Sequence, residues 1–351
     1  RFRDKEREKS FNQKKLFAEG AGKKGNSMIE IKGKKILLLG LGLHGGGVAT
    51  ARFLHKRGAQ LIISDLKDEK ILAPSLAKLA RWPARSAGTR AGWNDIQYIL
   101  GEHREKDVKW ADIVIQNPGV PKESPYIRLA QKLGKQIYNE ASLFFDIIKT
   151  QVIGVTGTRG KSTTASLIGA LLQAKDSGVV VAGNIRTTAM LDVVEKIVKP
   201  PAVVLELSSW QLEGLASIKA APQVVVVTNL YPDHLNRYAS LADYYNSKKA
   251  IFRYQGNSDW LVLNARDEMV RSWAAEAPGK VMFFSRLDHK HNGLFVRGHE
   301  IIFRQDKNEE PVAKLEDIKL AGEHNLENVL AAISVAKLFG VANNIIKKVL
   351  H

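Results

Sequence analysis

The sequence predicts an α/β protein with two successive domains, each built around a mainly parallel sheet. A strand, a glycine-rich turn, an amphipathic helix and a second strand follow one another after Ile29, which is a βαβ unit. A second glycine-rich strand-to-helix turn, "GVTGTRGKSTT", occupies residues 154–164, and strand-like runs alternate with helical runs after it. We expect a first domain at 28–149 and a second domain at 150–351.

The amino-acid composition limits the classes of protein to which the chain can belong. Hydrophobic residues make up 44% of the 351 residues, which suffices for two sizeable cores, and no apolar run approaches the roughly 20 residues of a membrane span. Residues 1–27 are polar and basic without apolar periodicity, so we expect a disordered extension there. The chain has no cysteine, which excludes disulfides and thiolate metal sites. We expect a cytoplasmic protein that acts as a monomer.

The charge of the chain points to an anionic partner. A formal net charge of +17 suits either nucleic acid or a phosphorylated small molecule. The aromatic residues do not interleave with the basic ones as they do in surfaces that stack bases. We therefore expect no nucleic-acid partner and favour a phosphorylated small molecule.

The first domain carries a glycine-rich turn that can hold a diphosphate. Gly40, Gly42 and Gly45 fit G-x-G-x-x-G. Asp65 ends the next strand, at about the sequence separation expected for an acidic residue that contacts a ribose. The turn binds phosphate through backbone N–H groups, so it fits a nicotinamide dinucleotide and a UDP-sugar equally. A later strand ends at residues 117–119, "NPG", which is either a ligand loop at a strand's carboxyl end or a plain turn.

The turn at 154–164 has the parts of a polyphosphate site. "QVIGV" before it is strand-like, and "STTASLIGALLQA" after it has apolar residues at helical spacing. Backbone N–H groups, the helix N-terminus, the ammonium of Lys161 and the hydroxyl of Ser162 suit a nucleotide with Mg²⁺. Val155 stands where the strict G-x-x-x-x-G-K-[ST] motif has its first glycine, so the match is to the shorter G-T-x-G-K-[ST] form.

Three polar clusters follow successive strands or helices of the second domain. Glu206 follows a buried-looking strand and can hold Mg²⁺ or act as a base. Asp233 and His234 follow another strand and suit a metal, and a helix then places Lys248 and Lys249 near the same edge. Their recurrence at one edge of a sheet predicts a common site.

These motifs, in this order, resemble the Mur ligases of peptidoglycan synthesis. The matching segments are "GTRGKSTT", "GNI" at 183–185, "ELSSWQLE", "DHLNRY", the Tyr245-to-Lys249 spacing and "GEHNLENVLAA" at 322–332. The "ELSS-aromatic-QLE" segment is similar to that of the branch that adds D-glutamate. The resemblance covers the chain from about Met28 to its end.

The resemblance implies an ATP-dependent ligase that joins D-glutamate to UDP-N-acetylmuramoyl-L-alanine (UDP-MurNAc-L-alanine). It implies a Rossmann-like UDP-binding domain followed by a P-loop-type ATPase domain, and a role in cell-wall biogenesis, cell shape and division. ATP and two Mg²⁺ ions are the implied cofactors. The γ-phosphate goes to the substrate carboxylate, and the amine of D-glutamate attacks the resulting acyl phosphate.

The resemblance also assigns roles to individual residues. The ATP-binding residues are Gly157, Thr158, Arg159, Gly160, Lys161, Ser162, Thr163, Asn325 and Asn328. The substrate-binding residues are Leu43, His44, Lys67, Asn117, Pro118, Gly119, Asn184, Ser208 and Gln211. The metal ligands are Ser162, Glu206, His234 and Lys249, the last as a carbamate, and the catalytic residues are Lys161, Glu206, His234 and Lys249. Asp65 is then no marker of a dinucleotide.

The sequence also departs from the pattern of the family. Arg159 replaces the usual asparagine of the loop, His44 stands where a small hydroxyl residue is common, and "NLYPDH" varies the lead-in to His234. The family's third, amino-acid-binding domain would begin roughly where the chain ends, so we expect the chain to ligate D-glutamate poorly. The alternatives are another Mur or folylpolyglutamate-type ligase, a nicotinamide-dependent dehydrogenase and a non-catalytic nucleotide-binding fragment.

Overall fold

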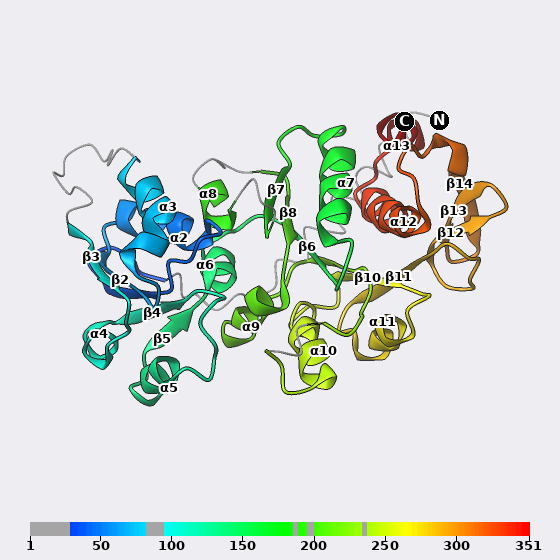
Figure 1. Ribbon diagram of the computed structural model, residues 1–351. Coiled ribbons are helices and arrows are strands. Elements are labelled where there is room, and N and C mark those ends of the chain that lie inside the picture. The colour runs from blue at the N-terminus through cyan, green and yellow to red at the C-terminus, as the bar shows by residue number, and fades with distance from the viewer. Residues whose placement is uncertain (1–28, 82–94, 185–188, 195–199, 234–236) are drawn as a thin grey trace. The chain divides into compact units, whose positions relative to one another are not determined.

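The computed structural model describes residues 29–81, 95–184, 189–194, 200–233 and 237–351. The chain forms two compact units, shown in Figure 1. The first unit takes residues 27–149 and 186–198, and the second takes 150–185 and 199–351. Residues 189–194 were expected in the second domain, whereas the structure groups them with the first. The sequence-based prediction for 1–27 lies outside the described residues.

The first unit has one parallel sheet of five strands in the order β3-β2-β1-β4-β5. Its strands are β1 (Lys35–Leu39), β2 (Gln60–Asp65), β3 (Gln97–Leu100), β4 (Ile113–Gln116) and β5 (Gln136–Tyr138). Its helices are α2 (Gly46–Lys56), α3 (Glu69–Ala80), α4 (Glu105–Trp110), α5 (Pro125–Lys132), α6 (Glu140–Ile147) and α8 (Met190–Val194). The chain order reverses between β1 and β4, which is where open α/β sheets bind ligands.

The register of this sheet brings three strand ends to one edge. Leu39 of β1 lies opposite Ser64 of β2 and Gln116 of β4. The glycine-rich turn after β1, the segment after β2 and the loop at 117–119 therefore leave the same edge. β1 reads KILLL and is buried in four of its five positions, because helices cover both faces of a parallel sheet.

The second unit has a nine-stranded sheet in the order β14-β13-β12-β11-β10-β9-β6-β8-β7. The parallel strands are β6 (Val152–Thr156), β7 (Val180–Gly183), β8 (Val203–Glu206), β9 (Val224–Val227), β10 (Trp260–Asn264), β11 (Lys280–Ser285) and β12 (Gly293–Arg297). Two antiparallel strands complete the edge, β13 (Glu300–Gln305) and β14 (Asn308–Lys314). The mainly parallel α/β fold that the sequence predicts is confirmed.

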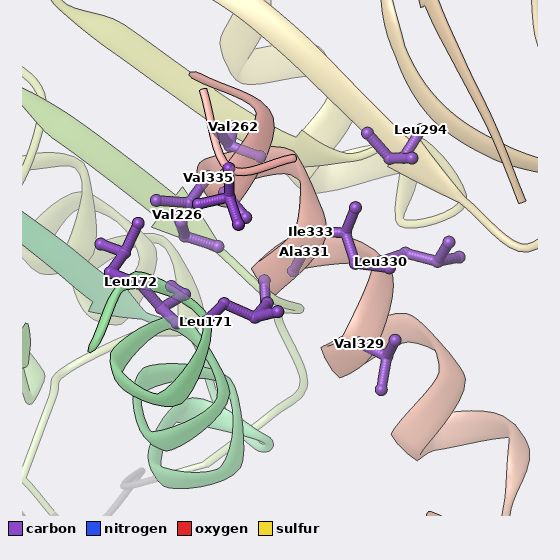
Figure 2. Packing of buried hydrophobic residues seen from close by; sticks show 14 of the residues in the cluster. Leu171, Leu172, Val226, Val262, Leu294, Val329, Leu330, Ala331, Ile333 and Val335 are labelled. Carbon is purple, nitrogen blue, oxygen red and sulfur yellow. The ribbon is translucent and has the colours of Figure 1, made fainter. Parts of the chain in front are cut away.

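Helices cover the sheet of the second unit. They are α7 (Lys161–Gln173), α9 (Ser209–Ser217), α10 (Leu241–Lys249), α11 (Glu268–Ser272), α12 (Glu323–Leu338) and α13 (Asn343–Leu350), with 3₁₀ turns η2 (Trp273–Glu276) and η3 (Leu315–Asp317). Figure 2 shows side chains of α7, α12 and the strands meeting in one apolar cluster. Because α7 begins at the loop of 157–160, this core fixes the position of the loop.

No helix in the described ranges has the length and hydropathy that crossing a bilayer requires. The longest, α12, has 16 residues.

Candidate active site

The loop at 157–160 joins β6 to α7 and depends on two glycines. Gly157 and Gly160 have φ angles of 145° and 79°, which residues with a side chain rarely adopt. A Cβ on Gly157 would lie 2.0 Å from Thr228 Oγ1, and a Cβ on Gly160 would lie 2.3 Å from Asn328 Oδ1. The loop is thus packed between the end of β9 and helix α12 with no room for side chains at either glycine.

The end of β9 holds the middle of this loop. The N–H of Thr158 donates to the carbonyl of Asn229 at 2.8 Å, and the N–H of Arg159 donates to Asn229 Oδ1 at 2.8 Å. The hydroxyl of Thr228 donates to the carbonyl of Arg159 at 2.7 Å. The backbone of the loop is therefore pre-organised, while the side chain of Arg159 is exposed to solvent.

Ser162 and Glu206 place two side-chain oxygen atoms side by side. Glu206 ends β8, one strand away from β6, and only 2% of the residue is exposed. The hydroxyl of Ser162, in the first turn of α7, donates to Glu206 Oε2 at 2.7 Å. A hydroxyl and a carboxylate at this distance suit Mg²⁺, which binds few protein oxygens and keeps several waters or phosphate oxygens.

Lys161 supplies a cation at the same helix start. Its ammonium donates to the carbonyl of Thr158 at 2.9 Å, within its own loop. Burial lowers the pKa of Lys161, and the carboxylates of Glu206 and Asp233 oppose that shift. Bound phosphate would replace the carbonyl with a full negative charge, so the site favours a polyphosphate.

The structure places Lys248, and not Lys249, against the loop. Both residues end α10, but the ammonium of Lys248 donates to the carbonyl of Gly157 at 2.9 Å and is only 2% exposed. The ammonium of Lys249 lies 2.5 Å from Glu276 and 5.6 Å from the ring centroid of Trp273. The sequence-based assignment of Lys249 as a metal ligand therefore has no support from its contacts.

Burial gives Lys248 unusual chemistry. Burial and the nearby charge of Lys161, partly opposed by Asp233, together lower the pKa of this lysine to about 7. The ring of Tyr244 lies 4.8 Å from the ammonium, and the hydroxyl of Tyr244 is 3.3 Å from Thr158 Oγ1. Near neutral pH a large fraction of Lys248 is thus a neutral amine, the form that reacts with carbon dioxide.

Two predicted ATP-binding asparagines lie in the first two turns of α12. The Nδ2 of Asn328 donates to Asn325 Oδ1 at 3.4 Å, and Asn328 Oδ1 accepts from Thr164 Oγ1 at 3.2 Å. The structure therefore brings Asn328 to α7 and the loop, with Asn325 beside it. Thr163 lies in the first turn of α7, half-buried.

Three predicted substrate residues lie at the β7 and β8 ends of the same sheet. Asn184 is exposed, and its N–H donates to the carbonyl of Glu206 at 3.0 Å. Ser208 and Gln211 form the capping box of α9, with both the N–H and the hydroxyl of Ser208 3.0 Å from Gln211 Oε1. Asn184 is thus available to a ligand, whereas these contacts of Ser208 and Gln211 serve to start a helix.

In the first unit, Asp65 supports the glycine-rich turn from within. Its Oδ2 accepts hydrogen bonds from the N–H groups of Leu41 and Gly42, both at 2.9 Å, and its Oδ1 accepts from the N–H of Lys67 at 2.9 Å. The residue is 4% exposed. A carboxylate used in this way is not offered to a ribose, which argues against a dinucleotide site.

The predicted UDP-binding residues gather at the carboxyl edge of this sheet. Leu43 and His44 lie in the exposed turn before α2, Lys67 follows β2, and residues 117–119 follow β4. The side chain of Asn117 lies within 3.0 Å of where a Cβ on Gly40 would be, which brings the loop against the turn. The edge therefore offers exposed side chains and the start of helix α2.

One predicted ligand, His234, lies outside the described residues. Across the described ranges, no three histidine or acidic side chains are grouped closely enough to hold a metal. Of the predicted metal ligands in the described residues, Ser162 and Glu206 are the pair in direct contact.

Comparison with known proteins decides the family. The model of the Mur ligase middle domain matches residues 155–336, and that of the MurD-like N-terminal domain of Mur ligases matches residues 34–139. The chain belongs to the Mur ligase family. Two relatives are each named UDP-N-acetylmuramoylalanine–D-glutamate ligase. The one from Roseiflexus sp. (strain RS-1) is 37% identical over 91% of this chain and 68% of its own length. The one from Clostridioides difficile (strain 630) is 38% identical over 92% and 68%.

Solved structures of other Mur ligases share the fold. UDP-N-acetylmuramate:L-alanyl-gamma-D-glutamyl-meso-diaminopimelate ligase from Neisseria meningitides aligns with a TM-score of 0.61 at 18% identity, over 91% of this chain and 97% of that one. UDP-N-acetylmuramate-alanine ligase MurC from Thermotoga maritima aligns with a TM-score of 0.53 at 23% identity, over 90% and 68%. The chain spans about two thirds of the length of the two relatives named above.

The structure brings two further residues to the loop of this Mur ligase. Sequence reasoning missed Thr228, and it placed Lys248 near the site without giving it a role. A signal for Lys248 was present, because Tyr244, Lys248, Ile251 and Phe252 recur at the spacing of one helical face. All four are buried. A lysine on the buried, apolar face of a helix is a candidate functional residue, because burying its charge is unfavourable and lysine is seldom buried without a specific interaction.

Proposed function

We propose that this Mur ligase joins D-glutamate to UDP-MurNAc-L-alanine with hydrolysis of ATP. The contact between Ser162 and Glu206 at the start of α7 carries the proposal, because it places two Mg²⁺ ligands beside the lysine of a phosphate loop. The names of the relatives supply the amino acid and the sugar nucleotide. ATP with Mg²⁺ would supply the transferable phosphoryl group and offset the negative charge of the reacting carboxylate.

The residues of the chain position and neutralise the reactants. Lys161 would bind phosphate oxygens, and Ser162 and Glu206 would hold Mg²⁺. Phosphorylation makes the substrate carboxylate an acyl phosphate, whose phosphate leaves when the amine of D-glutamate attacks. The rigid loop between β9 and α12 favours this step, because reacting groups that are held in place lose little entropy on the way to the transition state.

The modified lysine of the site is, in this proposal, Lys248. Carbon dioxide adds to a neutral amine to give a carbamate, which turns a cation into an anionic oxygen ligand. The pKa of about 7 and the position against the loop favour Lys248 for this role. The resemblance to the family implies His234 as a further ligand. Whether one or two Mg²⁺ ions bind would then depend on these two residues.

The first unit would bind the UDP-sugar. Helix α2 starts at the glycine-rich turn, and its N–H groups would receive the diphosphate. The buried carboxylate of Asp65 supports the turn and is not exposed to a ribose, which disfavours the dehydrogenase alternative.

Mass spectrometry of the reaction product tests the proposal. The chain is incubated with ATP, Mg²⁺, UDP-MurNAc-L-alanine and either D-glutamate or diaminopimelate. Because the sequence predicts poor ligation by this chain, we expect a low yield of a product that carries D-glutamate, together with ADP and phosphate. A product with the other amino acid would assign the chain to another branch of the family.

A further inference from the structure

Helix α8 belongs to the first unit although its neighbours in the chain belong to the second. It lies between β7 and β8 in sequence, yet it packs against α2 and α6. Met190, Leu191 and Val193 are at most 1% exposed. Helix α8 is therefore packed into the hydrophobic interior of the first unit and does not merely lie on its surface.

One buried carboxylate holds the start of α8. The N–H of Met190, the first residue of α8, donates to Glu140 Oε1 at 3.1 Å. Glu140 is the first residue of α6 and lies between Asn139 and Ser142, which form the capping box of this helix. It is 9% exposed. A helix start favours a negative charge, which offsets part of the cost of burying it.

The other oxygen of the same carboxylate lies against the glycine-rich turn. A Cβ on Gly46 would lie 3.1 Å from Glu140 Oε2. Gly46 is the first residue of α2 and follows Gly45 of the turn that we propose for the diphosphate. The negative charge of Glu140 would by itself repel a diphosphate bound at this turn. We therefore expect a contribution of Glu140 to binding that offsets the repulsion.

We propose that Glu140 is a positioning residue for the UDP-sugar, and this rests on the proposed function. Its carboxylate lies between the first turn of α2, where the diphosphate would bind, and the start of α8. Binding at the turn is thereby coupled to α8.

Hydrogen exchange and calorimetry on the full chain test this role. UDP-MurNAc-L-alanine should slow amide exchange in residues 190–194 of the wild type. Glu140→Ala should abolish that protection and weaken binding of the UDP-sugar about tenfold, with ATP affinity unchanged. Glu140→Gln keeps an acceptor for Met190, so it should keep the protection and bind equally or more tightly. Glu123→Ala, an exposed glutamate of the same unit, is the matched control.

The outcomes separate this inference from the proposed function. If Glu140→Ala binds the UDP-sugar as the wild type does and still protects 190–194, the positioning role is wrong. If the wild type itself does not bind the UDP-sugar, the proposed function fails first. If Glu140→Ala does not fold, Glu140→Asp replaces it, because the shorter side chain withdraws the carboxylate from the N–H of Met190. Unchanged protection in Glu140→Asp would equally refute the link.

Discussion

At the scale of single residues, the site is a balance of charges in a buried place. Lys161 begins α7 and Lys248 ends α10, and each donates to a carbonyl of the loop at 157–160. Glu206 and Asp233 oppose the lowering of the pKa of Lys161. The charge of Lys161 contributes to the lowered pKa of Lys248, so the pair is held together with one permanent cation that a polyphosphate can bind.

Removal of Lys161 should weaken nucleotide binding. Lys161→Ala loses a charged contact to phosphate, which is worth about 1.5–3 kcal/mol or roughly 10- to 100-fold in affinity. Isothermal titration with ATP and Mg²⁺ measures this effect. Lys175→Ala is the control, because Lys175 follows the end of α7 and contacts only carbonyls of residues 339 and 340 among the described residues. Equal affinities in both variants would remove Lys161 from the site.

The pKa of Lys248 predicts a pH dependence of stability. It is about 7 in the folded chain against an ordinary value of 10.5, so the unfolded chain binds more protons between these values. The contribution of Lys248 to the free energy of unfolding therefore rises with pH across this window, by at most about 1.4 kcal/mol per pH unit. Lys248→Met removes this slope, so the variant gains stability relative to the wild type as pH falls from 10.5 to 7.

Urea denaturation at several pH values, in buffer free of carbon dioxide, measures that slope. Lys249→Met is the control, since Lys249 pairs with Glu276 near the surface. Parallel stability curves for Lys248→Met and the wild type would contradict the burial of an ammonium at this position.

At the scale of elements, the loop depends on the packing of α7 against α12. Apolar residues of α7, β6, β9 and α12 form one cluster (Figure 2). The polar ends of the same helices carry Lys161 and Asn328. The packing of this cluster therefore fixes the position of the loop at 157–160, where α7 begins.

Ile333 of α12 tests this dependence, because it is fully buried in the cluster. Ile333→Ala should lower the free energy of unfolding by about 2–5 kcal/mol, through lost burial and a cavity. Met269→Ala, 45% exposed in the same unit, should change it by less than about 0.5 kcal/mol. Urea denaturation measures both variants, and a similar small effect in each would show that the cluster does not stabilise the unit.

Local patterns predicted the elements better than the contacts between them. The strands, the glycine-rich turns and the start of α7 follow from alternation, helical spacing and glycine positions that lie within a few residues. The choice between Lys248 and Lys249 depends on which face of α10 is buried, and the sequence offered the same i, i+4 spacing from a tyrosine for both. Helix α8 contacts the first unit through buried apolar residues and through Glu140, which is 50 residues away from Met190. Such contacts have no local signature.

At the scale of the whole molecule, two α/β units each present a helix that begins at a glycine-rich turn. The first has the turn before α2 and the second has the loop before α7. The N-terminal and middle domain models of Mur ligases match these same two regions. A ligase that uses a sugar nucleotide and ATP accounts for both loops, whereas a dehydrogenase leaves the second without a purpose.

The first unit should therefore prefer the UDP-sugar to a dinucleotide. We expect UDP-MurNAc-L-alanine to bind with micromolar affinity and NAD⁺ not to displace it, because Asp65 is occupied by amides of the turn. Competition calorimetry measures this preference, with UDP alone as the control for the shared diphosphate. Displacement by NAD⁺ at micromolar concentration would restore the dinucleotide interpretation.

The central claim is that ATP is spent on the carboxylate of the UDP-sugar, and trapping with hydroxylamine tests it most directly. Hydroxylamine attacks an acyl phosphate, releases phosphate and leaves a hydroxamate that mass spectrometry detects. We predict an ATP-dependent hydroxamate of UDP-MurNAc-L-alanine in the wild type and about 100-fold less in Glu206→Gln, which loses the carboxylate beside Ser162. Binding of both ATP and the UDP-sugar without any hydroxamate would contradict the claim.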